Sequence, residues 1–190
     1  MRFDRVANKE TAIKTIKELE IIPQKLIDLT TQFGINTYCF NKQLYPSQIG
    51  LLNKINTPDG RSFDETACFI PWRKAIALYD WDFDESEYAF STVIHEYAHA
   101  LDYTLGSILK EDTFLSNINP IILNGWKKQK GLDWYANLNP HEYFAQAFMA
   151  YYQKDKYRYK PKIYYEHICE ELKDKDDDMY YFIDNLIKTI

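Results

Sequence analysis

The most informative segment of the sequence is His95-Glu96-Tyr97-Ala98-His99. It lies within a segment whose apolar residues recur three and four positions apart, namely Phe90, Val93, Ile94, Tyr97, Ala98, Leu101 and Leu105. That spacing predicts a helix over about 86–106 with one apolar stripe facing a core. At 100° per residue, His95 and His99 fall off the stripe and lie about 40° apart, so both imidazole rings can reach one point.

Two neutral imidazoles one helical turn apart suit a tetrahedral zinc ion. Glu96 lies about 100° further round the helix, which makes it a poor ligand. It is instead placed where a general base could take a proton from a zinc-activated water. Asp102 shares the face of the two histidines, and we expect its carboxylate to accept the free ring N–H of one of them. The HExxH pattern therefore predicts a catalytic zinc centre.

The third protein ligand is left open by spacing alone. Glu142 lies at the start of a predicted helix, but a capping box with Asn139 as the N-cap explains a glutamate there equally well. His141 is a rival ligand on the same helix, about 100° away from Glu142. Further rivals lie on a later predicted helix: Glu166, His167, Glu170 and Glu171.

Along the rest of the chain, the spacing of apolar residues and the turn signals predict a helix, a small sheet and then several helices. Residues 9–33 have helical spacing, interrupted at Pro23 and ended at Gly34. A strand is expected over 35–40, and a hairpin over 66–79. The second hairpin strand is either internal to the sheet or an edge that pairs with an extended peptide. Later helices are expected over 120–130, 140–155, 162–173 and 178–189. This order predicts an α+β fold rather than alternating strands and helices.

Length and charge limit the classes of protein to which this chain can belong. The 190 residues fit a single domain over 1–190, and the net charge of −5 without a basic stripe argues against nucleic acid as a partner. No apolar run approaches the ~18 residues of a membrane span. No signal peptide is visible, so we expect a cytoplasmic protein, or a secreted or delivered one if a signal was removed or another chain carries it. We expect a monomer.

Two segments carry a resemblance to a known family. HEYAHALD, followed by Tyr135 and the run Asn-Pro-His-Glu142-Tyr-Phe-Ala-Gln146-Ala-Phe, resembles the anthrax lethal factor catalytic-domain family, which also contains secreted bacterial Pro-Pro endopeptidases. The specific match covers 92–103 and 134–152. A looser likeness covers the remainder of a catalytic core over 60–190, whereas the helical part over 1–55 matches nothing.

The resemblance implies a fold and a set of roles. The fold would be a zincin-like metallopeptidase domain, with a small mixed sheet, the HExxH helix at the active site and a mostly helical C-terminal half. Glu142 would be the third zinc ligand, and Tyr135 would donate its hydroxyl to the developing oxyanion. Gln146 stands where the family usually has a glutamate; its neutral amide can still hydrogen-bond a ligand.

Together these observations predict a zinc metalloendopeptidase with one catalytic Zn²⁺ ion. It would hydrolyse a protein or peptide bound in an extended conformation, with Glu96 as general base. The alternative is an inactive or weakly active zinc-containing module that binds peptides. Gln146 favours this alternative, whereas the intact Glu96 argues against it because a binding module needs no general base.

Overall fold

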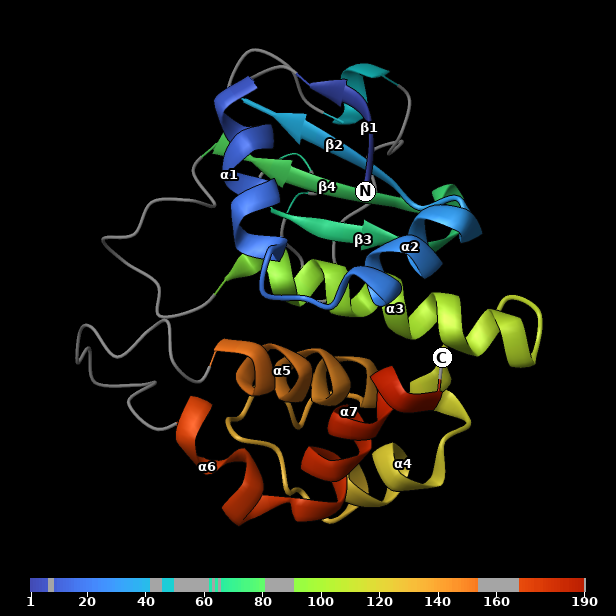
Figure 1. Cartoon of the computed structure of the whole chain (residues 1–190), viewed down its shortest axis with the longest axis vertical. Coiled ribbons are helices and arrows are strands. Elements are labelled where there is room, and N and C mark those ends of the chain that lie inside the picture. The colour runs from blue at the N-terminus through green and yellow to red at the C-terminus, as the bar shows by residue number, and fades with distance from the viewer. Residues whose placement is uncertain are drawn as a thin grey trace.

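The computed structural model describes residues 1–6, 9–41, 46–49, 62, 64, 66–80, 91–153 and 168–189. The expected helix starts at about 86 and 162 lie outside these residues, as do the rival ligands Glu166 and His167. Figure 1 shows a sheet with two helices over one face, a group of C-terminal helices at the other end of the molecule, and one long helix running between them.

The sheet has four strands and is mixed. Its spatial order is β1-β2-β4-β3, with β1 parallel to β2, β2 parallel to β4, and β3 antiparallel to β4. This confirms the small mixed sheet and the hairpin expected over 66–79. The strands are β1 (Arg2–Val6), β2 (Asn36–Phe40), β3 (Cys68–Ile70) and β4 (Ala75–Tyr79).

Two features of the sheet differ from or extend the sequence analysis. β4 lies between β2 and β3, so its interpretation as a peptide-binding edge is wrong and β3 is the edge on that side. In the sequence RFDRV of β1, the adjacent polar residues Asp4 and Arg5 interrupt the alternation that is typical of a strand. It forms by pairing along β2, where the Tyr38 hydroxyl donates to Asp4 Oδ2 at 2.6 Å.

The N-terminal helical segment is split as expected. α1 (Lys9–Leu19) and α2 (Gln24–Phe33) are separated at Pro23, which lacks the N–H that would continue the hydrogen-bond ladder. Gly34 ends α2 with φ 97°, in the left-handed region where a side chain would be strained. These two helices link β1 to the parallel strand β2 and cover one face of the sheet (Figure 1).

The second half of the chain is helical, as the resemblance implies. α3 (Thr92–Leu109) runs between the sheet and the C-terminal helices (Figure 1). The helices that follow are α4 (Pro120–Lys127), α5 (Pro140–Gln153), α6 (Ile168–Lys175) and α7 (Asp177–Thr189), with short 3₁₀ turns η1 (Pro46–Ile49), η2 (Pro71–Arg73) and η4 (Leu115–Asn117).

One core holds α3 in place from both sides. Ile94 and Leu101 of α3 are fully buried in the same apolar cluster as Leu26 of α2, Ile76 of β4 and Phe148 of α5. Burying such side chains contributes about 1.5–3 kcal/mol each, so the helix is fixed relative to both layers.

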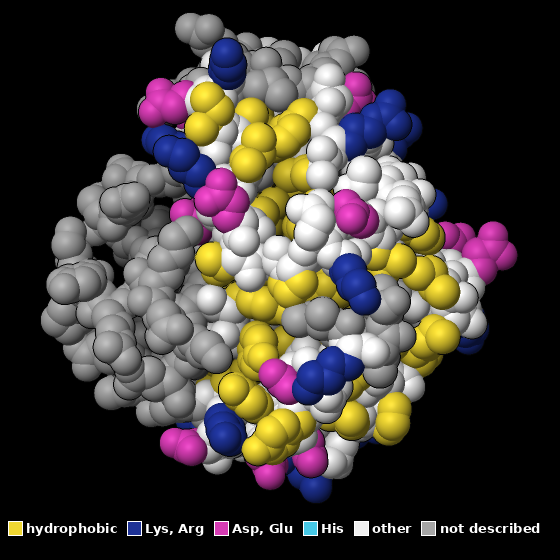
Figure 2. All heavy atoms as spheres, in the orientation of Figure 1, with side chains coloured by type: hydrophobic (Ala, Val, Ile, Leu, Met, Phe, Trp, Pro, Cys, Tyr) yellow, Lys and Arg dark blue, Asp and Glu magenta, His cyan; other side chains and the backbone are white. Residues whose placement is uncertain are grey.

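On the surface shown in Figure 2, Lys and Arg lie scattered among Asp and Glu. Among the described residues, none of the helices combines the length and the apolar character needed to cross a membrane.

Candidate metal centre

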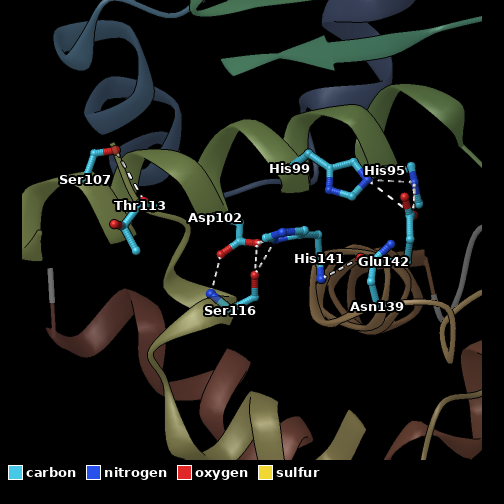
Figure 3. Close-up of polar contacts among 9 residues, drawn as sticks. All are labelled: His95, His99, Asp102, Ser107, Thr113, Ser116, Asn139, His141 and Glu142. Atoms are coloured by element: carbon cyan, nitrogen blue, oxygen red, sulfur yellow. Dashed lines mark hydrogen bonds and ion pairs between the residues drawn. The ribbon is translucent and has the colours of Figure 1, made fainter. Parts of the chain in front are cut away.

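α3 presents its two histidines to α5. Ser91 caps the helix by accepting the N–H of Ile94 at 3.1 Å, which fixes where the first turn begins. The apolar stripe faces the core as expected, and His95 and His99 lie one turn apart on the side that faces α5 (Figure 3). The two ring Nε2 atoms are 3.1 Å apart.

Glu142 of α5 completes a triangle of ligand atoms. Its Oε2 lies 3.1 Å from Nε2 of His95 and 3.3 Å from Nε2 of His99. Asn139 caps α5 by accepting the N–H of Glu142 at 3.0 Å, but the glutamate side chain points to the histidines (Figure 3). The N-cap is therefore present, while the carboxylate takes part in the cluster.

These atoms fit a zinc ion. Zinc bonds nitrogen and oxygen at about 2.0–2.2 Å, so ligands at tetrahedral angles lie about 3.3–3.6 Å from one another. The three observed separations of 3.1, 3.1 and 3.3 Å are close to these edges. Oε2 of Glu142 is buried and, within the described residues, accepts no well-aligned hydrogen bond. A buried carboxylate oxygen that faces two imidazoles and accepts no well-aligned hydrogen bond from the described residues suits coordination to a metal ion.

The electrostatics of the cluster are those of a tightly coupled ion pair. Burial opposes the charged form of His99, but the charge of Glu142 and its contact outweigh burial and raise the pKa of His99 to about 9. Burial likewise opposes the charged form of Glu142, yet the charge of His99 and the close approach of both rings hold the pKa of that carboxyl well below its ordinary value. A cation at the triangle would replace the proton on His99.

Glu96 lies beside this cluster and is not part of it. The side chain is buried, and burial is the main cause that raises the pKa of its carboxyl above the ordinary value. The charges of His95 and His99 act in the opposite direction, and the carboxylate accepts the backbone N–H of Phe69 on the edge strand β3. A buried carboxylate with a raised pKa, close to a metal triangle, is a stronger base than an exposed one.

Tyr135 lies on the loop that precedes α5. Its ring is 6.0 Å from the ring of His95 between centroids. The loop is folded by Asp133, whose Oδ1 accepts the N–H of Ala136 at 2.7 Å, and by Trp126, whose Nε1 donates to the carbonyl of Asn137 at 3.1 Å. The structure thus places the ring of Tyr135 near that of His95, whereas its role as a hydroxyl donor to the oxyanion stays a prediction.

Asp102 has other partners than those expected. It is completely buried, and its oxygens accept the backbone N–H of Ser116 at 2.7 Å and the Ser116 hydroxyl at 2.6 Å. Nδ1 of His141 lies 3.6 Å from Oδ2 of Asp102. Within the described residues, no hydrogen bond joins Asp102 to His95 or His99. The expected hydrogen bond from the ring N–H of His95 or His99 to Asp102 therefore stays a prediction, and no described contact supports it.

Gln146 lies one helical turn after Glu142 on α5. It is buried, with 6% of its surface exposed, and its Oε1 has no hydrogen-bond partner among the described residues. Its role beside a metal ion therefore remains a prediction.

The other ligand candidates do not join the triangle where they are described. Nδ1 of His141 contacts Ser116 at 2.7 Å. Glu170 and Glu171 lie in α6, where their side chains are not described. Two residues near the site escaped the sequence analysis, Ser116 and Asp133. Neither carries a periodic signal, because Ser116 lies in the short turn η4 and Asp133 in the loop before α5.

The fold is shared with a solved structure. A Pro-Pro endopeptidase from Paenibacillus alvei superimposes with a TM-score of 0.68 over 97% of this chain and 96% of that chain, at 20% sequence identity. No protein-family model matches the sequence, and no curated protein matches it. At this identity the likeness shows the fold alone. It confirms the mixed α+β architecture over nearly the whole chain, including the N-terminal residues for which the sequence offered no match.

Proposed function

We propose that this protein is a zinc-dependent metalloendopeptidase. The observation that carries the proposal is the triangle formed by Nε2 of His95, Nε2 of His99 and Oε2 of Glu142, with the buried carboxylate of Glu96 beside it. The structural likeness to a Pro-Pro endopeptidase supports the same conclusion. His95, His99 and Glu142 would hold the ion, and one coordination position would remain open.

The residues have distinct tasks in hydrolysis. Zinc held at the triangle would supply Lewis-acid chemistry, lowering the pKa of water towards 7 and polarising the scissile carbonyl. Glu96 accepts a proton from the attacking water and passes it to the nitrogen of the leaving amine. Its burial raises the pKa of its carboxyl and so strengthens it as a base, while the backbone of Phe69 acts in the opposite direction and favours the charged form. Tyr135 donates its hydroxyl to the oxygen that becomes negative in the transition state.

The proposal is tested by cleavage of a diverse peptide library with zinc-loaded protein. The library includes peptides with consecutive prolines, because the similar structure is described as a Pro-Pro endopeptidase. Glu96→Gln keeps the size of the side chain and removes the base, so we expect cleavage to fall by about 10²–10⁴-fold with zinc binding unchanged. Glu20→Gln, at an exposed glutamate, is the matched control and should cleave as the wild type does.

The outcomes separate an enzyme from a binding module. Cuts that are lost in Glu96→Gln establish the general base and give the substrate motif. Equal cleavage by the wild type and Glu96→Gln would refute the mechanism. Peptides that are retained by zinc-loaded protein but cut by neither variant would favour the peptide-binding module.

A further inference from the structure

Asp102 is a buried carboxylate that, among the described residues, hydrogen-bonds to neither zinc-binding histidine of the proposed site, so its role follows from its other hydrogen-bond partners. It lies on α3 one turn after His99, and none of its surface is exposed. A carboxylate removed from water destabilises the fold unless its oxygens are hydrogen-bonded. Both oxygens are satisfied by one residue, Ser116 of η4, whose backbone N–H and hydroxyl bind Oδ1 and Oδ2 respectively.

The Ser116 hydroxyl extends this contact to α5. Its Oγ lies 2.7 Å from Nδ1 of His141 as well as 2.6 Å from Oδ2 of Asp102 (Figure 3). A hydroxyl has one hydrogen, and the carboxylate oxygen can only accept. The hydroxyl therefore donates to Asp102 and accepts from Nδ1–H of His141. The result is a chain of hydrogen bonds from Nδ1 of His141 through the Ser116 hydroxyl to Asp102.

This arrangement is not a nucleophilic triad, although it contains the same residue types. Ser116 lies between the histidine and the aspartate, its hydroxyl hydrogen is directed to Asp102, and none of its surface is exposed. A substrate cannot reach it. Its task is thus to join elements of the fold.

The elements that it joins are those that carry the metal ligands. Asp102 follows His99 on α3, and His141 directly precedes Glu142 on α5. η4 packs against both helices. The ring of His141 also packs on Phe114, with 4.2 Å between centroids, so its position is fixed by shape as well as by the hydrogen bond.

The backbone of this first turn of α5 is fixed independently. Asn139 Oδ1 accepts the N–H groups of His141 at 2.9 Å and of Glu142 at 3.0 Å. The cap sets the helix start, while the side-chain contact to Ser116 sets how the first turn lies against α3.

We propose that Asp102, Ser116 and His141 are positioning residues of the metal site, which fix the first turn of α5 against α3 and so hold the Glu142 carboxylate at the two imidazoles. This inference rests on the proposed zinc site. It moves Asp102 from a direct partner of a zinc-binding histidine to a group that acts through Ser116 on the third ligand. His141 in turn acts through the backbone it shares with Glu142.

The test measures zinc affinity by competition with a chelator, together with the visible spectrum of the cobalt-substituted protein. His141→Phe keeps an aromatic ring on Phe114 and removes Nδ1–H. We expect it to bind zinc about 10–100-fold more weakly than the wild type, as found when partners of metal ligands are lost. We also expect the cobalt spectrum to lose the intensity of a tetrahedral site.

A conservative pair distinguishes positioning from general stability. His141→Asn places an amide nitrogen where histidine carries Nδ1, whereas His141→Gln places it where histidine carries Nε2. Zinc affinity should be restored by Asn and not by Gln. Ser116→Ala should weaken zinc binding as His141→Phe does. Ser107→Ala is the matched control, because its hydroxyl donates to Thr113 at 3.3 Å near the end of α3, and it should bind zinc normally.

Two failures are distinguishable. A wild-type protein that takes up no zinc would overturn both this inference and the proposed function. Wild-type zinc binding with undiminished affinity and spectrum in His141→Phe and Ser116→Ala would overturn the inference alone. Equal affinity in His141→Asn and His141→Gln would also overturn it, since only one of them restores the donor.

Discussion

The coupling of His99 to Glu142 predicts how strongly zinc competes with protons. The pKa of His99 is raised to about 9, so at pH 7 about 99% of this ring carries a proton in the metal-free protein. Zinc needs the neutral ring and must displace that proton. Two pH units between 7 and 9 correspond to about 2.7 kcal/mol, so zinc affinity at pH 7 should be about 100-fold weaker than above pH 9.

The assay is chelator competition from pH 6.5 to 9.5, corrected for the chelator's own protonation. Affinity should rise about tenfold per pH unit up to about pH 9 and then level off. Calorimetry at pH 7 in buffers of different ionisation enthalpy should show release of about one proton per zinc bound. Affinity that is constant between pH 6.5 and 8.5, or binding without proton release, would show that no proton on His99 competes with zinc.

The same shift has a second consequence, for the stability of the metal-free protein. Because the folded-state pKa of His99 lies above its ordinary 6.5, its stabilising effect is full below pH 6.5 and is lost as pH rises through about 9. The melting temperature of the metal-free protein should therefore fall over this window through this group, whereas the rise on adding zinc should grow. Glu142→Gln removes the charge that raises the His99 pKa, and it should abolish the fall.

Two further substitutions test the oxyanion donor and the packing behind the site. Tyr135→Phe removes only the hydroxyl, so kcat should fall by about 10²–10³-fold with zinc affinity unchanged, and an unchanged kcat in peptide hydrolysis would exclude this role. Gly106→Ala adds a Cβ 2.2 Å from the backbone nitrogen of Leu115, so the free energy of unfolding should fall by about 3 kcal/mol or more. Thermal denaturation should show a melting temperature about 6–12 °C lower; a melting temperature equal to the wild type's would show that η4 can shift freely.

The parts of the site that could be predicted from sequence are those that depend on helical geometry. His95 and His99 share one face of a helix because they are four residues apart, whatever packs around them. The apolar stripe that includes Val93 and Leu101 gave the direction of the core, and the structure confirms it. Pro23 and Gly34 likewise marked helix ends through local backbone constraints.

The parts that could not be predicted depend on contacts between distant segments. Spacing placed Asp102 on the face of the histidines, but its partner Ser116 lies 14 positions later, in a turn whose path no local pattern indicates. Glu142 could not be separated from its rivals because the approach of α5 to α3 is a property of the packed core. β1 was missed because its polar residues become a strand only by pairing with β2.

The central claim is that His95, His99 and Glu142 hold one zinc ion. Anomalous X-ray scattering at the zinc edge, from crystals grown with zinc, tests it most directly. We expect one strong peak about 2.0–2.2 Å from Nε2 of each histidine and Oε2 of the glutamate. A zinc-containing crystal with no peak at the triangle, or with its strongest peak at other residues, would contradict it.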